Sequence, residues 1–197
     1  MAGMTRAFIA VALPEPTRLA LERLQGALRG ELPGLSWTSS AQLHLTIAFL
    51  GDVPTRDLDQ IGDALVKELS GVHPFEILVQ GLGAFPSPRR ARVLWAGVIG
   101  EFLPHLDGLR RAVVRAASSA GHPPADDRFH PHVTLARAKP GRGPSPDLET
   151  ICSRHRDWKA GPLPVASAEL MASVLTPRGP NHTVLRSAGL GPTGSSP

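Results

Sequence analysis

Two tripeptides of the form His-x-Thr hold the side chains of this sequence that are best suited to chemistry. They are His44-Leu45-Thr46 and His132-Val133-Thr134, and the second follows the first by 88 residues (132 − 44). Imidazole titrates near neutral pH, so a neutral copy can accept a proton while a protonated copy donates one. Threonine hydroxyls can donate hydrogen bonds to phosphate oxygens. Two such pairs in one place would suit the cleavage of a phosphodiester without a metal ion.

The two tripeptides lie in apolar segments, 42–51 and 130–138, that are typical of β-strands. Side chains two residues apart on a strand share a face, so each histidine points the same way as its threonine. Leu45 and Val133 point the opposite way and are expected to pack in the core. The histidines and threonines are therefore expected to face outward.

The same alternation makes predictions for two residues further along these strands. Phe49 is expected to turn toward the core as a packing residue, with base stacking as the alternative. Arg137 is expected to lie on the face opposite His132, and it can reach a shared site only if the strand ends or bulges before it.

The elements around the tripeptides form a repeat. Each half of the chain is predicted as strand, helix, strand, helix, strand, and shifting the first half by 88 residues overlays it on the second. We therefore predict an α+β fold made by duplication, with two lobes related by a pseudo-two-fold axis. Each lobe is an antiparallel sheet with helices on its outer face, and the His-x-Thr strands line a central cleft. The predicted ranges are 6–13, 14–30, 42–51, 54–69, 74–83, 92–99, 101–120, 130–138, 146–158, 164–175 and 182–186.

Length and composition indicate one folded domain. With 197 residues, 42% hydrophobic and 19% charged, the chain can bury a substantial core. We expect a single bilobal domain over 1–188, with lobes at about 14–84 and 100–175, strands near both termini that can cross between lobes, and a disordered Gly/Ser/Pro tail at 189–197. No segment is apolar enough for a membrane, and the single cysteine excludes a disulfide framework. A cytoplasmic location is expected.

The charged and aromatic residues constrain the partners. A net charge of +4 permits an anionic partner. Arg92 and Arg128 each adjoin a strand of the expected site and are candidates to attract an anionic backbone at its rim. Six Phe, three Trp and no Tyr are too few to indicate a wide base-stacking platform.

A zinc site is the alternative interpretation of the histidines. His130 and His132 form a His-x-His pair on one strand face, and His44 could supply a third imidazole. The spacing suggests no fourth ligand, so we expect no metal or other cofactor.

The residues around both tripeptides resemble a known family. HLTIAFLG (44–51) and FHPHVTLAR (129–137) are similar to the paired signatures of the two-histidine (2H) phosphoesterases. The branch that they resemble is the bacterial and archaeal RNA 2′,3′-cyclic phosphodiesterase, also called 2′-5′ RNA ligase or LigT-like. RAFIAVALP, FPSPRRARVLW and SVLTPRGP fit the same branch, so the resemblance runs from about Arg6 to Arg186.

This resemblance implies hydrolysis of an RNA or nucleotide 2′,3′-cyclic phosphate to a 2′-phosphomonoester, without a cofactor, and a weak reverse 2′-5′ ligation. It implies that His44 is the general acid and His132 the general base, and that Thr46 and Thr134 bind phosphate. Arg137 matches a basic position that closes the second signature. One residue departs from the pattern, because relatives often have a tyrosine where this chain has His182.

Two alternatives remain open at the level of the sequence. The chain could bind RNA ends or nucleotides without catalysis, or the same site could act on another cyclic or 2′-5′-linked substrate. We expect a monomer, since an outward cleft needs no partner chain.

Overall fold

The computed structural model describes residues 3–101, 103–124, 128–139, 147–176 and 179–191. Four α-helices are present in this part of the chain: α1 (Glu15–Leu28), α2 (Leu58–Leu69), α3 (Leu103–Ser119) and α4 (Glu149–Arg154). Short 3₁₀ turns are η1 (Ser40–Gln42), η2 (Thr55–Asp57) and η3 (Pro88–Arg90). The strands are β1 (Met4–Ala12), β2 (Leu35–Trp37), β3 (His44–Pro54), β4 (Phe75–Phe85), β5 (Val93–Ile99), β6 (His132–Ala138), β7 (Lys159–Val165), β8 (Ser167–Thr176) and β9 (Gly179–Gly189).

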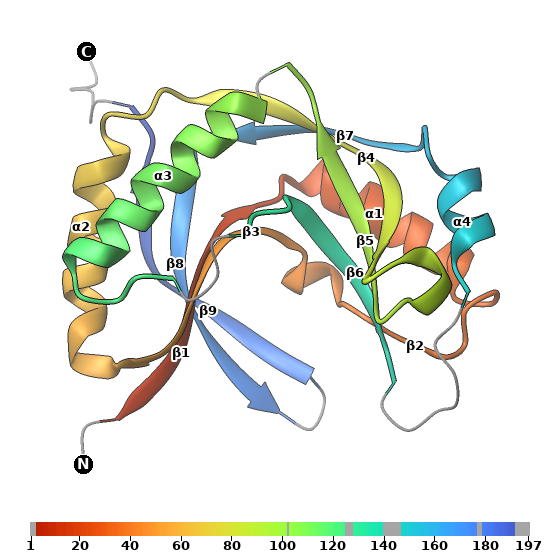
Figure 1. Cartoon of the computed structure of the whole chain (residues 1–197), viewed down its shortest axis with the longest axis horizontal. Coiled ribbons are helices and arrows are strands. Elements are labelled where there is room, and N and C mark those ends of the chain that lie inside the picture. The colour runs from red at the N-terminus through yellow and green to blue at the C-terminus, as the bar shows by residue number, and fades with distance from the viewer. Residues whose placement is uncertain (1–2, 102, 125–127, 140–146, 177–178, 192–197) are drawn as a thin grey trace.

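All nine strands of the described residues join in one antiparallel, curled sheet (Figure 1). Its order is β7-β4-β5-β6-β3-β1-β8-β9, and β2 pairs with β6 next to the start of β3. Helices cover one face of the sheet. Helices α2 and α3 pack over the half that contains β3 and β9, and α1 and α4 pack over the half that contains β4 and β7. Among the described residues, the opposite face carries no helix.

Apolar spacing explains why the helices pack on this face. In α2, Leu58, Ile61, Leu65 and Leu69 recur at helical spacing and all are buried. They join one continuous core with the inward side chains of the strands. None of the helices in the described ranges combines the length and the apolar character that crossing a membrane requires.

The sheet confirms the predicted duplication. Its order is symmetric about the junction of β3 and β6, with β1 matching β5 and β4 matching β8. Shifting β1 by 88 residues gives 92–100, which overlays β5, and shifting α1 gives 103–116, which overlays α3. The mixed α+β architecture with a pseudo-two-fold axis is therefore the one that the sequence predicts.

The two halves of the sheet exchange elements between the predicted lobe ranges, 14–84 and 100–175. One half combines β3 and α2 from the first range with α3 and β8 from the second. The other half combines α1 and β4 with β6, α4 and β7. Each half therefore depends on the whole chain, and the ranges interleave in space.

The C-terminal third differs from the prediction in two places. The predicted strand 164–175 is two strands, because the chain leaves β7 at Ala166 and crosses to the other half of the sheet as β8. The predicted disordered tail is wrong for 189–191, because Leu190 is buried and its N–H donates to the Ala166 carbonyl at 2.8 Å. The remaining residues, 192–197, lie outside the described ones.

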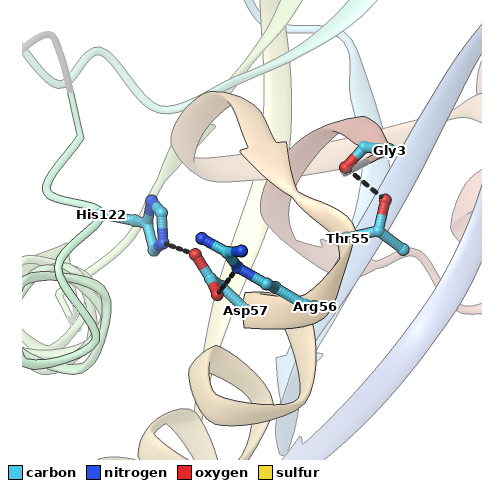
Figure 2. A network of polar contacts seen from close by, with 5 residues as sticks. All are labelled: Gly3, Thr55, Arg56, Asp57 and His122. Carbon is cyan, nitrogen blue, oxygen red and sulfur yellow. Dashed lines mark hydrogen bonds and ion pairs between the residues drawn. The ribbon is translucent and has the colours of Figure 1, made fainter. Parts of the chain in front are cut away.

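Polar contacts join the start of α2 to distant parts of the chain (Figure 2). The Asp57 carboxylate accepts a hydrogen bond from His122 Nε2 at 3.1 Å and lies 3.5 Å from Arg56 Nε. Thr55 Oγ1 donates to the Gly3 carbonyl at 3.0 Å. These contacts connect the entry of α2 to the segment after α3 and to the residue before β1, so the helices over this half are held in place at one end.

Candidate active site

The two His-x-Thr strands are neighbours at the centre of the sheet. Among the described residues, β3 and β6 share a single register pair, Leu45 with Val133, and both side chains are fully buried. In an antiparallel pair, one step in either direction sets His44 opposite Thr134 and Thr46 opposite His132. All four side chains lie on the face without helices. The structure therefore brings the four predicted residues together.

Backbone carbonyls orient both imidazoles in the same way. His44 Nδ1 lies 2.8 Å from the Gln42 carbonyl, and His132 Nδ1 lies 2.6 Å from the His130 carbonyl. A carbonyl can only accept a hydrogen bond, so each Nδ1 carries a proton and each Nε2 carries the lone pair in the neutral ring. In each strand the carbonyl belongs to the residue two positions before the histidine, as the duplication requires.

The two Nε2 atoms differ in their partners. His44 Nε2 accepts a hydrogen bond from Thr46 Oγ1 at 3.0 Å. Within the described part of the chain, His132 Nε2 has no such partner, so its lone pair is free to accept a proton from a bound molecule.

Burial keeps the free imidazoles neutral. Burial is the largest cause that lowers the pKa of His44 to about 4, and the nearby His182, His132 and Arg137 lower it further. The pKa of His132 is also lowered, first by burial and then by His130 and Arg137. His132 and Arg137 are therefore near enough to His44 for their charges to lower its pKa.

The low pKa of His44 predicts a pH-dependent stability. Between pH 6.5 and about 4 the unfolded chain takes up a proton at His44 that the folded protein excludes. Stability is therefore complete above pH 6.5 and falls as the pH drops, by about 1.4 kcal/mol per pH unit at most from this group. His44→Gln should flatten the dependence of the urea-unfolding free energy on pH in this window. An unchanged slope would contradict the burial of His44.

A β-bulge brings Arg137 to the site. On β5, Trp95 pairs with Thr134 and Leu94 pairs with Ala136, so Leu135 is an extra residue in β6. The alternation shifts by one after it, and the exposed Arg137 lies on the face of His132. The sequence predicts that Arg137 reaches the site only if the strand ends or bulges before it, and the bulge meets this condition.

A matching bulge overturns the prediction for Phe49. Thr46 pairs with Ala10 and Ala48 pairs with Ile9, so Ile47 is the extra residue of β3. Phe49 is therefore turned out of the core and is 59% exposed. The prediction that it packs in the core is wrong, because it assumed unbroken alternation.

Arg92 and Arg128 lie next to the strands of the site rather than in them. Arg92 precedes β5 and Arg128 lies four residues before β6, and both side chains are exposed. The sequence predicts that both lie at the rim, and a role in binding RNA stays a prediction for both.

Aromatic rings from distant strands surround the two histidines. The His44 ring lies 5.0 Å from Phe8 and 5.2 Å from His182, measured between ring centroids. The His132 ring lies 5.0 Å from Phe85 and 6.1 Å from Trp95. Apart from His182, which departs from the family pattern, none of these neighbours is predicted as part of the site from the sequence, because they come from β1, β4 and β5. The fold therefore places Phe8, Phe85 and Trp95 beside the two imidazoles.

Among the described residues, the histidines do not form the three-ligand metal site that was the alternative interpretation. No group of three or more His, Cys, Asp or Glu side chains there is arranged to hold a metal ion. His130 and His132 do lie close together, with ring centroids 6.2 Å apart.

Comparison with known proteins agrees with this geometry. The sequence matches the LigT like Phosphoesterase family over residues 11–95 and 99–181. The chain belongs to this family. The two matched segments contain one His-x-Thr tripeptide each, so the family match follows the duplication seen in the sheet. The family includes the 2H phosphoesterases that the sequence resembles.

Relatives of this LigT-like chain carry a common name. An RNA 2′,3′-cyclic phosphodiesterase of Methanothermobacter thermautotrophicus is 34% identical over 90% of this chain and 95% of its own. One of Thermus thermophilus is 35% identical over 91% of this chain and 87% of its own. A crystal structure of a Thermus thermophilus protein superimposes with a TM-score of 0.74 at 33% identity, over 96% of this chain and 100% of that one. Apo LigT of E. coli shares the fold, with a TM-score of 0.72 at 22% identity, over 95% and 98% of the two chains.

Proposed function

We propose that this LigT-like chain hydrolyses the 2′,3′-cyclic phosphate of an RNA end or a nucleotide to a 2′-phosphomonoester. The observation that carries the proposal is the antiparallel register around Leu45 and Val133, which sets two His-Thr pairs on one face of the sheet. The relatives named RNA 2′,3′-cyclic phosphodiesterase support the same reaction. General acid and base catalysis needs two proton-transferring groups on opposite sides of the phosphorus.

The hydrogen bonds of the two rings support the proposed role of each histidine. His132 Nε2, whose lone pair is free, takes a proton from water as its oxygen forms a bond to phosphorus. The bond from phosphorus to the 3′ oxygen breaks, and His44 Nε2 gives that oxygen a proton. After the reaction His132 is protonated and His44 is neutral. Before the next turnover His132 releases a proton to solvent and His44 takes one up.

Binding of the substrate supplies the charge that the acid requires. Both imidazoles have lowered pKa values and are neutral in the free site near neutral pH. The negative charge of a cyclic phosphate favours an imidazolium beside it, so binding raises the pKa of His44 and is accompanied by proton uptake. Thr46, Thr134 and Arg137 hold the phosphate oxygens as charge accumulates on them.

The reverse reaction uses the same groups. A 5′ hydroxyl takes the place of water: His132 accepts its proton as the 5′ oxygen bonds to phosphorus, the bond to the 3′ oxygen breaks, and His44 gives that oxygen a proton, which leaves a 2′-5′ linkage. We include weak 2′-5′ ligation in the proposal on this ground.

The partners follow from the substrate. RNA ends and nucleoside 2′,3′-cyclic phosphates are the proposed ligands, with Arg92 and Arg128 drawing the RNA backbone toward the site. A monomer in the cytoplasm remains our proposal for its state and location.

A single reaction tests the proposal. The protein is incubated with a nucleoside 2′,3′-cyclic phosphate in EDTA, and the product is identified by phosphorus NMR. We expect the 2′-phosphate at a rate that EDTA leaves unchanged. A 3′-phosphate would reverse the roles of the two oxygens, activity lost with EDTA would indicate a metal, and binding without turnover would favour a binding protein.

A further inference from the structure

Both bulges of the His-x-Thr strands are held by a side chain from a helix. Arg110 Nη1 of α3 donates to the Ile47 carbonyl at 2.7 Å, and Gln25 Nε2 of α1 donates to the Leu135 carbonyl at 3.0 Å. Ile47 and Leu135 are the extra residues of the two bulges and are themselves 88 positions apart (135 − 47). The same device therefore occurs in each half of the duplication.

Gln25 holds its bulge from a fully buried position. Its side chain is 1% exposed, and Nε2 also donates to the Thr38 carbonyl at 2.9 Å. The N–H of Thr38 in turn donates to the Leu135 carbonyl at 2.9 Å. Both acceptors of the amide are carbonyl oxygens, so its nitrogen must face them. A buried network that is satisfied in this way holds one geometry, because any other leaves a polar group without a partner.

The bulge that Gln25 holds decides where Arg137 points. Without the extra residue Leu135, the alternation of β6 would turn Arg137 toward the helix-covered face. With it, Arg137 lies on the face of His132, close enough to lower the pKa of both catalytic imidazoles. Ser36 of β2 pairs with Arg137, so the segment that Gln25 fixes through Thr38 also flanks the arginine.

We propose that Gln25 is a positioning residue for the reaction, which it supports by holding the Leu135 bulge that presents Arg137 to the phosphate. This inference rests on the proposed function of the site. Gln25 lies on the opposite side of the sheet from the substrate and acts only through Arg137.

Gln25→Met tests the proposal, with Thr17→Val as the matched control. Thr17 lies on the same helix, is also 1% exposed and donates one buried hydrogen bond, to the Pro162 carbonyl at 2.7 Å, away from the site. We expect Gln25→Met to lower kcat/KM for a nucleoside 2′,3′-cyclic phosphate by about 10- to 100-fold, the effect of one lost hydrogen bond to a charged group. Thr17→Val should change it by less than about twofold. Equal losses in the two variants would overturn the proposal.

A double-mutant cycle separates positioning from a general structural role. On an Arg137→Met background, Gln25→Met should cost less than about twofold further, because the group through which it acts has already been removed. Independent, multiplicative losses would overturn the proposal. If Gln25→Met does not fold, Gln25→Asn keeps an amide that is one methylene shorter, and the same cycle is measured with it.

The affinity for inorganic phosphate tests the positioning role without any turnover of substrate. Wild-type protein should bind phosphate more tightly than Gln25→Met and as tightly as Thr17→Val, as measured by calorimetry. If wild-type protein does not hydrolyse cyclic phosphates but this order of affinities holds, the proposed function fails and the positioning role stands. If Gln25→Met binds phosphate as wild type does, the positioning role fails whatever the activity.

Discussion

His132→Ala should lower kcat for a nucleoside 2′,3′-cyclic phosphate by about 10²- to 10⁴-fold, the contribution of one general base. His132 Nδ1 donates to the His130 carbonyl, which leaves the Nε2 lone pair directed away from the backbone with no partner among the described residues. Removal of the ring leaves water without a proton acceptor. The ring lies on the open face of the sheet, so the substitution leaves the core beneath it, around Val133, in place.

Rescue and a control make this result specific. Added imidazole should restore part of the lost rate to His132→Ala, because it can enter the space of the missing ring and accept the same proton. His73→Ala, which removes an exposed histidine in the connection between α2 and β4, should have wild-type kinetics. The two-histidine mechanism is wrong if His132→Ala keeps a rate within about fivefold of wild type, well below the expected effect of a general base.

His44→Ala should cause a loss of similar size, about 10²- to 10⁴-fold, that depends on the leaving group. His44 is the proposed acid, and a 3′ alkoxide leaves poorly without a proton. A nitrophenyl phosphodiester has a leaving group that needs no proton, so the loss on that substrate should be much smaller. For His132→Ala the loss should be similar on both substrates, because attack by water still needs a base.

The comparison of the two substrates decides which histidine has which role. If the nitrophenyl ester rescues His132→Ala instead of His44→Ala, the assignments are reversed and the catalytic pair stands. If it rescues neither variant, proton donation to the leaving group is not what His44 contributes. Both rates are measured above pH 6.5, where the lowered pKa of His44 does not destabilise the fold.

The sequence alone predicted the features that depend on the alternation of side chains along a strand and on the internal repeat. The alternation of HLT and HVT placed the histidines and threonines on one face, because neighbouring side chains of a strand must point in opposite directions. The 88-residue offset predicted the duplication, because equivalent elements of a repeat fold alike. The family resemblance covered both tripeptides in order, and the family match over 11–95 and 99–181 agrees with it.

Tertiary contacts determine the features that the alternation of neighbouring residues does not determine. Whether Phe49 and Arg137 face the core or the site depends on one extra residue in each strand, at Ile47 and Leu135. Those bulges are fixed by partners on other elements, Arg110 of α3 and Gln25 of α1, which lie 63 and 110 positions away along the chain. The rings of Phe8 and Trp95 reach the histidines only through the pairing of the central strands.

By itself, then, the chain's order of residues predicted which side chains are suited to the chemistry and that they occur twice. Only the folded sheet decided how the two sets meet: Leu45 beside Val133, a bulge after each threonine, and an arginine on the same face as the imidazoles. The physical reason is that a strand's alternation is a property of neighbouring residues, whereas register and bulges are set by hydrogen bonds to strands and helices that are remote in the sequence.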